Sequence, residues 1–256
     1  MPNVRSQAVA LALCTAAWSL PTTAMADADA FAPYAEALAD RLVIGTANFK
    51  DAVESGDLET AKAAWLAARP AWETGETFYG EFFPSFDEAM DTWPDAKRGF
   101  HAVERVMFEQ NTLDGAGDMA TALADNAADL RETISETEMT DQGLLNGLAG
   151  ITFEVGAEKV DGGESPYSDS SLSDMQNNAD GIEVTCALAF APAVSEDAPE
   201  LHGRIMEHVA ALEAALAVDS LAEMDAAEVT RLSEDLALLF ADAAEPLGLE
   251  APEIGG

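Results

Sequence analysis

His101 and Glu104 stand three residues apart, and they are the pair in this chain whose types and spacing most suggest chemistry. If their segment is helical, both side chains project from one face, because positions three apart are neighbours on a helix surface. An imidazole and a carboxylate placed this way can bind the same cation. The same spacing also fits a solvated, hydrogen-bonded pair, so that explanation stays open.

Other carboxylates cluster in the segments before this pair. Glu73 and Glu76 are three apart and share the margin of an aromatic stripe, where Arg69 and Glu73 could also form an ordinary ion pair on an exposed helix face. Residues 81–93 are rich in aromatic and acidic side chains and predict an irregular packed loop that leads to the next helix. Asp91 in that loop could simply cap the helix.

Composition limits what the chain can bind. Its 256 residues are 48% hydrophobic, which is enough for one or two sizeable cores. Acidic residues number 48 against 12 lysines and arginines, giving a net charge of -36. Such a surface repels phosphates, which excludes nucleic acid as a partner, and it favours cations. High acidity also keeps proteins soluble in saline surroundings without any binding role.

The first 26 residues have the pattern of a secretory signal peptide. Arg5 is their only charged residue, an apolar run covers Ala8 to Leu20, and an Ala-x-Ala cleavage site precedes Asp27. We therefore expect export to the periplasm as a soluble protein. No later apolar run reaches the roughly 18 residues that a membrane helix needs.

Two cysteines carry separate predictions. Cys14 lies in the signal segment and could be lipidated, but Leu13 before it is larger than the residue that a lipoprotein peptidase prefers. Cys186 is the one cysteine left after cleavage, so an internal disulfide is excluded, and its apolar helical context predicts a small buried side chain.

Helical periodicity runs through the rest of the chain and predicts an all-α fold of packed helical bundles. Trp65, Trp72 and Tyr79 recur every seven residues and should line one side of a helix that resets near Pro70. The expected helices cover residues 30–54, 57–79, 94–110, 119–138, 144–158, 199–218 and 226–243. In addition, residues 164–181 are expected to form a turn that enters a helix continuing to residue 190. His202 and His208 are six apart on one of them and should be surface residues.

Two groups of segments resemble the imelysin-like family, which includes the periplasmic iron-uptake proteins of the EfeO and EfeM type. The first group is Ala63 to Trp65, Ala71 to Glu76, and Gly99 to Glu104, which supplies a G-x-H-x-x-E motif. The second is Tyr167 to Gly181. The second segment departs from the family's pattern at four positions: Asp169, Ser171, Ser173 and Met175.

The resemblance implies one imelysin-like helical domain over residues 27–256, built as two packed four-helix-type bundles, without the cupredoxin-like domain of longer members. It implies a metal site, for iron first, with zinc, copper or manganese as alternatives. It also implies a membrane iron permease as the receiving partner and allows a periplasmic peroxidase as a second partner. The candidate ligands carried over by position are Glu73, Glu76, Asp91, His101 and Glu104, with Asp87 in reserve.

Two other classes of protein remain open at this stage. A metallopeptidase could use the H-x-x-E pair, although the chain has no H-E-x-x-H motif and its other two histidines lie far along the sequence. A carbohydrate-binding protein could use the stripe of Trp65, Trp72 and Tyr79 as a stacking surface. Aromatic residues at this spacing also suit a helix core.

Overall fold

The computed structural model describes residues 25–92 and 97–255, and every regular element in these ranges is a helix. The all-α prediction is therefore confirmed. The predicted signal peptide lies outside the described residues except for its last two positions, and so do Cys14 and Pro94.

One bundle is formed by the first half of the chain. Its long helices pack against one another, and α4 and α5 cover α6 on the side that faces the rest of the protein. At the start of α2, the Asp57 carboxylate accepts a hydrogen bond from the Thr60 amide at 3.0 Å, as the sequence predicts. The elements are α1 (Ala28–Glu54), α2 (Leu58–Glu73), α3 (Glu76–Phe82), α4 (Pro84–Asp91), α5 (Gly99–Glu104), the π-helical turn η1 (Arg105–Glu109) and α6 (Ala116–Glu136).

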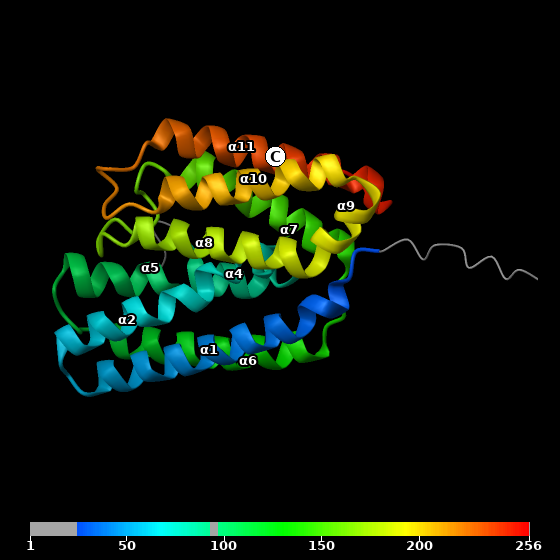
Figure 1. The fold of residues 1–256 in the computed structure, drawn as a ribbon. Helices are drawn as coiled ribbons and strands as arrows, with labels where there is room; N and C mark the ends of the chain where they lie inside the picture. Colours follow the sequence, from blue (N-terminus) through cyan, green and yellow to red (C-terminus); the bar gives the residue numbers. More distant parts are fainter. Residues whose placement is uncertain (1–24, 93–96, 256) are drawn as a thin grey trace, which may run out of the picture.

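The second bundle follows in the chain, and Figure 1 shows it stacked on the first, with α8 lying beside α2. Packing of α3 against α7 and α8 closes the same boundary. Gly181 of α8 permits this approach, since an added Cβ there would lie 2.3 Å from the Thr74 carbonyl oxygen. The elements are α7 (Asp141–Glu154), η2 (Val155–Lys159), α8 (Ser171–Thr185), η3 (Cys186–Phe190), α9 (Ala191–Asp197), α10 (Pro199–Leu216) and α11 (Ala226–Leu247).

The structure corrects the predicted course of residues 57–93. Pro70 lies inside α2, and the break comes later, at Thr74 and Gly75, where the absence of a Cβ on Gly75 makes room for the Tyr79 ring. The segment predicted as an irregular loop is mostly helical, comprising the end of α3 and all of α4. Its aromatic residues obscured the helical pattern, and Pro84 begins α4 in the position that proline favours.

The aromatic stripe is part of the core. Trp65, Trp72 and Tyr79 are all fully buried, and the Trp72 and Tyr79 rings stack with their centroids 4.9 Å apart. These rings therefore offer no exposed stacking surface for a sugar. Cys186 is buried as well, and burial raises the pKa of its thiol to about 12. None of the described helices combines the length and apolar character needed to cross a membrane.

Candidate metal centre

The histidine of the H-x-x-E pair is positioned by the start of α5. Gly99 begins this helix with a φ of +82°, and a Cβ there would lie 2.5 Å from the Met90 carbonyl oxygen. Only glycine suits both the left-handed backbone and the close contact. The Phe100 carbonyl accepts a hydrogen bond from the Trp65 indole at 3.2 Å, which holds α5 against α2. Together these contacts fix the position of α5 and of His101 on it.

His101 is buried and lies between carboxylates on both sides of its ring. Its Nε2 is 3.3 Å from Asp91 Oδ1 and 3.8 Å from Glu164 Oε1. Its Nδ1 is 3.5 Å from Glu104 Oε2. Burial by itself would lower the pKa of His101, but Asp91 and the bond to Glu104 raise it overall.

Glu104 is held by the loop that precedes α8. Its Oε1 accepts hydrogen bonds from the Tyr167 amide at 3.0 Å and from the Ser168 amide and hydroxyl, each at 2.8 Å. Its second oxygen faces the Nδ1 of His101. The two members of the pair therefore meet through Nδ1, while Nε2 points toward other carboxylates.

Those other carboxylates come from separate segments. Asp91 ends α4, Glu73 ends α2, Glu76 begins α3, and Glu164 lies in the loop between η2 and α8. These side chains form two overlapping sets, and within each set the ligand atoms lie within 4.8 Å of one another. One set is Asp91, His101 and Glu164, and the other is Glu73, Glu76, Asp91 and Glu164. We call these five residues the acidic centre: Glu73, Glu76, Asp91, His101 and Glu164.

Two basic side chains neutralise part of this acidity. Arg69 is buried, its guanidinium lies over the rings of Trp65 and Phe100, and it pairs with Glu73 and, at 2.5 Å, with Asp91. Lys159, at the end of η2, is buried too, and its ammonium touches three members of the acidic centre.

Carboxylates still outnumber these cations. In the described part of the chain, the two permanently charged cations Arg69 and Lys159 contact five acids, and Glu104 adds a sixth through its pairing with His101. The six acids are Glu73, Glu76, Asp91, Glu104, Glu164 and Asp174. Burial would raise the pKa of Glu73, yet Arg69 and Lys159 lower it to about 2. Burial raises the pKa of Glu76 well above its usual range, and the neighbouring charge of Glu73 adds to this. Without a further cation, the surplus acid is balanced by bound protons.

A sixth acid, Asp174 on α8, borders the acidic centre. It receives a hydrogen bond from the Ser165 hydroxyl at 2.5 Å and lies 3.5 Å from Arg69. Burial raises its pKa to about 7. This buried carboxyl therefore changes its charge near neutral pH.

The structure brings four of the five predicted ligands together, namely Glu73, Glu76, Asp91 and His101, and it places Glu104 behind the imidazole. The reserve residue Asp87 lies instead in an adjoining cleft of about 200 Å³, lined by Glu76, Glu81, Asp87 and Glu154. Burial, followed by the charge of Asp91, raises the pKa of Asp87 to about 6.

Two structural explanations considered for these residues are wrong. Arg69 and Glu73 do pair, but both side chains are buried rather than on an exposed face. Asp91 also does not cap the helix that carries His101, because α5 begins at Gly99 with Arg98 as its N-cap. The Asp91 carboxylate instead binds Arg69 and, at 2.7 Å, the Trp72 indole in the protein interior.

Sequence reasoning missed Glu164, Lys159 and Asn178. The Asn178 amide donates to Glu73 Oε2 at 3.2 Å and to Glu76 Oε2 at 2.7 Å. Asn178 lies in the segment 167–181 that resembles the family, and the backbone of the same segment holds Glu104. That resemblance was the available signal that this segment lies against the other acids.

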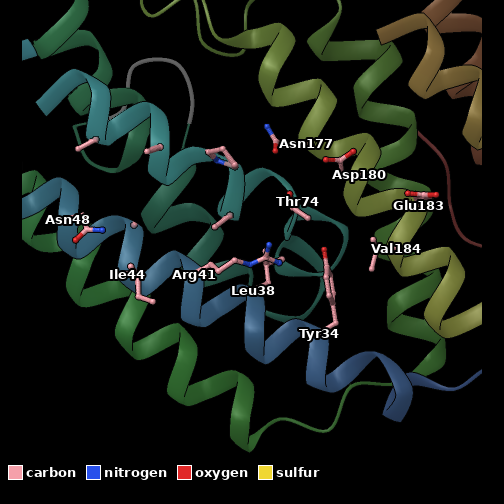
Figure 2. A pocket seen from close by; sticks show the side chains of 15 residues that line it. Tyr34, Leu38, Arg41, Ile44, Asn48, Thr74, Asn177, Asp180, Glu183 and Val184 are labelled. Atoms are coloured by element: carbon pink, nitrogen blue, oxygen red, sulfur yellow. The ribbon is translucent and has the colours of Figure 1, made fainter. Parts of the chain in front are cut away.

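A larger groove of about 790 Å³ opens on the other side of α2. Figure 2 shows Tyr34 and Arg41 of α1 facing Asp180 and Glu183 of α8 across it, with Thr74 nearby. Since Arg69 and Glu73 point from α2 toward the acidic centre, this helix separates the groove from that centre.

Comparisons with known proteins agree with this architecture. A structure of a Parabacteroides distasonis protein, named as an iron-regulated protein A precursor, superposes with a TM-score of 0.71 over 88% of this chain and 97% of its own, at 18% sequence identity. At that identity the likeness shows the fold.

Sequence comparison is more specific. The iron uptake system component EfeO of Escherichia coli K12 is 30% identical over 233 residues, and the EfeO of Shigella flexneri gives the same values. The match covers 82% of this chain but 62% of those relatives, so the chain spans less than two thirds of their length. The family model described as Imelysin (peptidase M75) matches residues 28–98 and 95–239. This chain therefore belongs to the imelysin family.

Proposed function

We propose that this protein is a periplasmic metal-binding component of an iron-uptake system, which captures iron at the acidic centre and delivers it to a membrane permease. The relatives named as EfeO are described as iron uptake components. We extend that role to this chain, with a periplasmic peroxidase as a second partner of the system.

One observation carries the proposal: side chains from separate segments converge on one buried point and leave an excess of negative charge. The ligand atoms of Glu73, Glu76, Asp91 and Glu164 lie within 4.8 Å of one another. A buried group of like charges is costly unless cations or protons balance it. A metal ion is the guest that this arrangement suits best.

Each residue has a separable role in the proposed site. His101 would bind through Nε2, because this nitrogen faces Asp91 and Glu164. Glu104 would orient the imidazole through Nδ1, as carboxylates behind metal-bound histidines commonly do. The three hydrogen bonds to its other oxygen fix its own position.

The donor set suits iron or manganese and also admits zinc or copper. Several carboxylate oxygens with one imidazole nitrogen form a hard to borderline site, and affinity alone rarely selects among such metals. Iron is preferred here because the relatives are described as iron-uptake components.

The test is a calorimetric titration of Fe²⁺ under anaerobic conditions and of Mn²⁺ into the metal-free protein. We expect His101→Ala to weaken binding by at least about tenfold. His208→Ala is the matched control, since His208 is partly exposed on α10 and its ring contacts the Arg204 carbonyl, away from the acidic centre. Equal affinity and stoichiometry in all three proteins would remove the proposed site.

A further inference from the structure

Lys159 occupies the position where the proposed site needs positive charge. Its Nζ lies 2.7 Å from Glu76 Oε2, 3.3 Å from Glu164 Oε1 and 3.4 Å from Glu73 Oε2. These three acids come from α2, α3 and the loop after η2, and all of them belong to the acidic centre. The ammonium thus contacts most of the carboxylates that a metal ion would share.

The side chain is buried and remains charged. Only 4% of Lys159 is exposed. Burial would lower the pKa of the amine, but Glu76, Glu73 and Glu164 together raise it well above its ordinary value. A metal ion that binds the same oxygens must therefore displace a cation that is already there, rather than enter an empty ring of acids.

We propose that Lys159 is a tethered cation that holds the acidic centre together in the metal-free protein, competes with the incoming metal and is displaced when the metal binds. This inference rests on the proposed function, because it concerns the affinity and release of metal at the same site. A competing internal cation weakens binding and so favours transfer of the metal to a partner.

The structure offers a place for the displaced ammonium. The acidic cleft of about 200 Å³ shares Glu76 with the acidic centre and is also lined by Asp87 and Glu154. The positive charge of Lys159 already favours the ionised forms of Asp87 and Glu154, since it opposes the rise in their pKa values. A lysine side chain has a flexible four-carbon stem. The backbone of Lys159 lies at the end of the π-helical turn η2, so its ammonium can move without moving α7.

The first experiment compares Lys159→Met with Lys97→Met. Methionine keeps a long apolar stem and removes the charge, and Lys97 loses the same charge at an exposed position. We expect Lys159→Met to bind Mn²⁺ about tenfold more tightly than wild type or better, because no internal cation has to leave. Lys97→Met should change the affinity by less than about twofold, since surface charges are screened by salt.

A second experiment uses the wild-type protein and so does not depend on the folding of a variant. The sequence contains four lysines, Lys50, Lys62, Lys97 and Lys159, which peptide mass spectrometry can follow separately after treatment with an amine-acetylating reagent. Lys159 should react slowly in the metal-free protein and severalfold faster after loading with Mn²⁺. The other three lysines should keep their rates and serve as internal controls.

The outcomes separate this inference from the proposed function. If His101→Ala loses binding while Lys159→Met binds Mn²⁺ no more tightly than wild type, the metal site stands and the displacement is refuted. Equal acetylation of Lys159 with and without metal refutes it as well. If the wild type binds no metal, both proposals fail together.

Discussion

The raised pKa of Asp174 makes a quantitative prediction about the stability of the metal-free protein. This carboxyl is buried on α8 beside Arg69 and Ser165, and burial raises its pKa from 3.8 to about 7. A carboxyl whose pKa is higher in the folded than in the unfolded state stabilises the fold below its unfolded pKa. That stabilisation is lost as the pH rises through the folded pKa, here between about 4 and 7.

The size of the effect follows from the pKa change. Each pKa unit corresponds to about 1.4 kcal/mol, so a rise from 3.8 to about 7 corresponds to at most about 4 kcal/mol. Asp174→Asn cannot ionise and keeps a polar partner for Ser165. Relative to wild type, we expect it to unfold with a similar free energy at pH 4 and a free energy about 2–4 kcal/mol higher at pH 8.

Urea unfolding in the presence of a chelator, at pH 4, 6 and 8, measures this difference. Asp125→Asn is the matched control, because Asp125 is exposed on α6 and the same chemical change there should leave the pH dependence unaltered. An Asp174→Asn variant that is equally stable or less stable than wild type at pH 8 would refute the reasoning that surplus acid destabilises the empty site.

Three further predictions test other parts of the structure. Gly181→Ala should lower the free energy of unfolding by about 1–3 kcal/mol, because its Cβ would meet the Thr74 carbonyl. The Cβ of the control variant Gly203→Ala on α10 meets nothing, so this variant should be neutral or stabilising by up to about 1 kcal/mol. Equal melting temperatures of the two variants would contradict this expectation. Glu104→Gln should weaken Mn²⁺ binding about 10- to 100-fold in calorimetry without changing its stoichiometry, and a lost site would make Glu104 a direct ligand. Mn²⁺ affinity should fall steadily from pH 8 to pH 5, because protons compete at the carboxyls with raised pKa and at His101; a flat profile would argue against binding at these groups.

Much of the fold could be predicted from periodicity, because a helix that packs on one side repeats its apolar residues at a fixed spacing. Phe100, Val103 and Met107 follow this helical spacing, and all three are fully buried. The heptad of Trp65 and Trp72 likewise indicated a core face. The course of residues 81–93 could not be predicted, since two short helices joined at Phe83 leave too few turns for a period to emerge.

The candidate site was predictable only where its residues share a motif or a helix. Glu164 lies in a loop 60 positions after Glu104, so no local spacing connects it to His101. Lys159 was overlooked for a related reason, because lysine is ordinarily exposed and only tertiary structure encloses it among three acids. Arg69 has a suitable partner in Glu73, but sequence cannot tell whether such a pair is buried or solvated.

The most direct test of the central claim is a crystal structure of the protein loaded with iron, with data collected at the iron absorption edge. We predict one strong anomalous peak at about 2.0–2.3 Å from His101 Nε2 and from oxygens of Asp91 and Glu164, with the ammonium of Lys159 moved away from Glu76. A peak at His202 or His208, or an iron-loaded crystal with no peak among these acids, would contradict the claim.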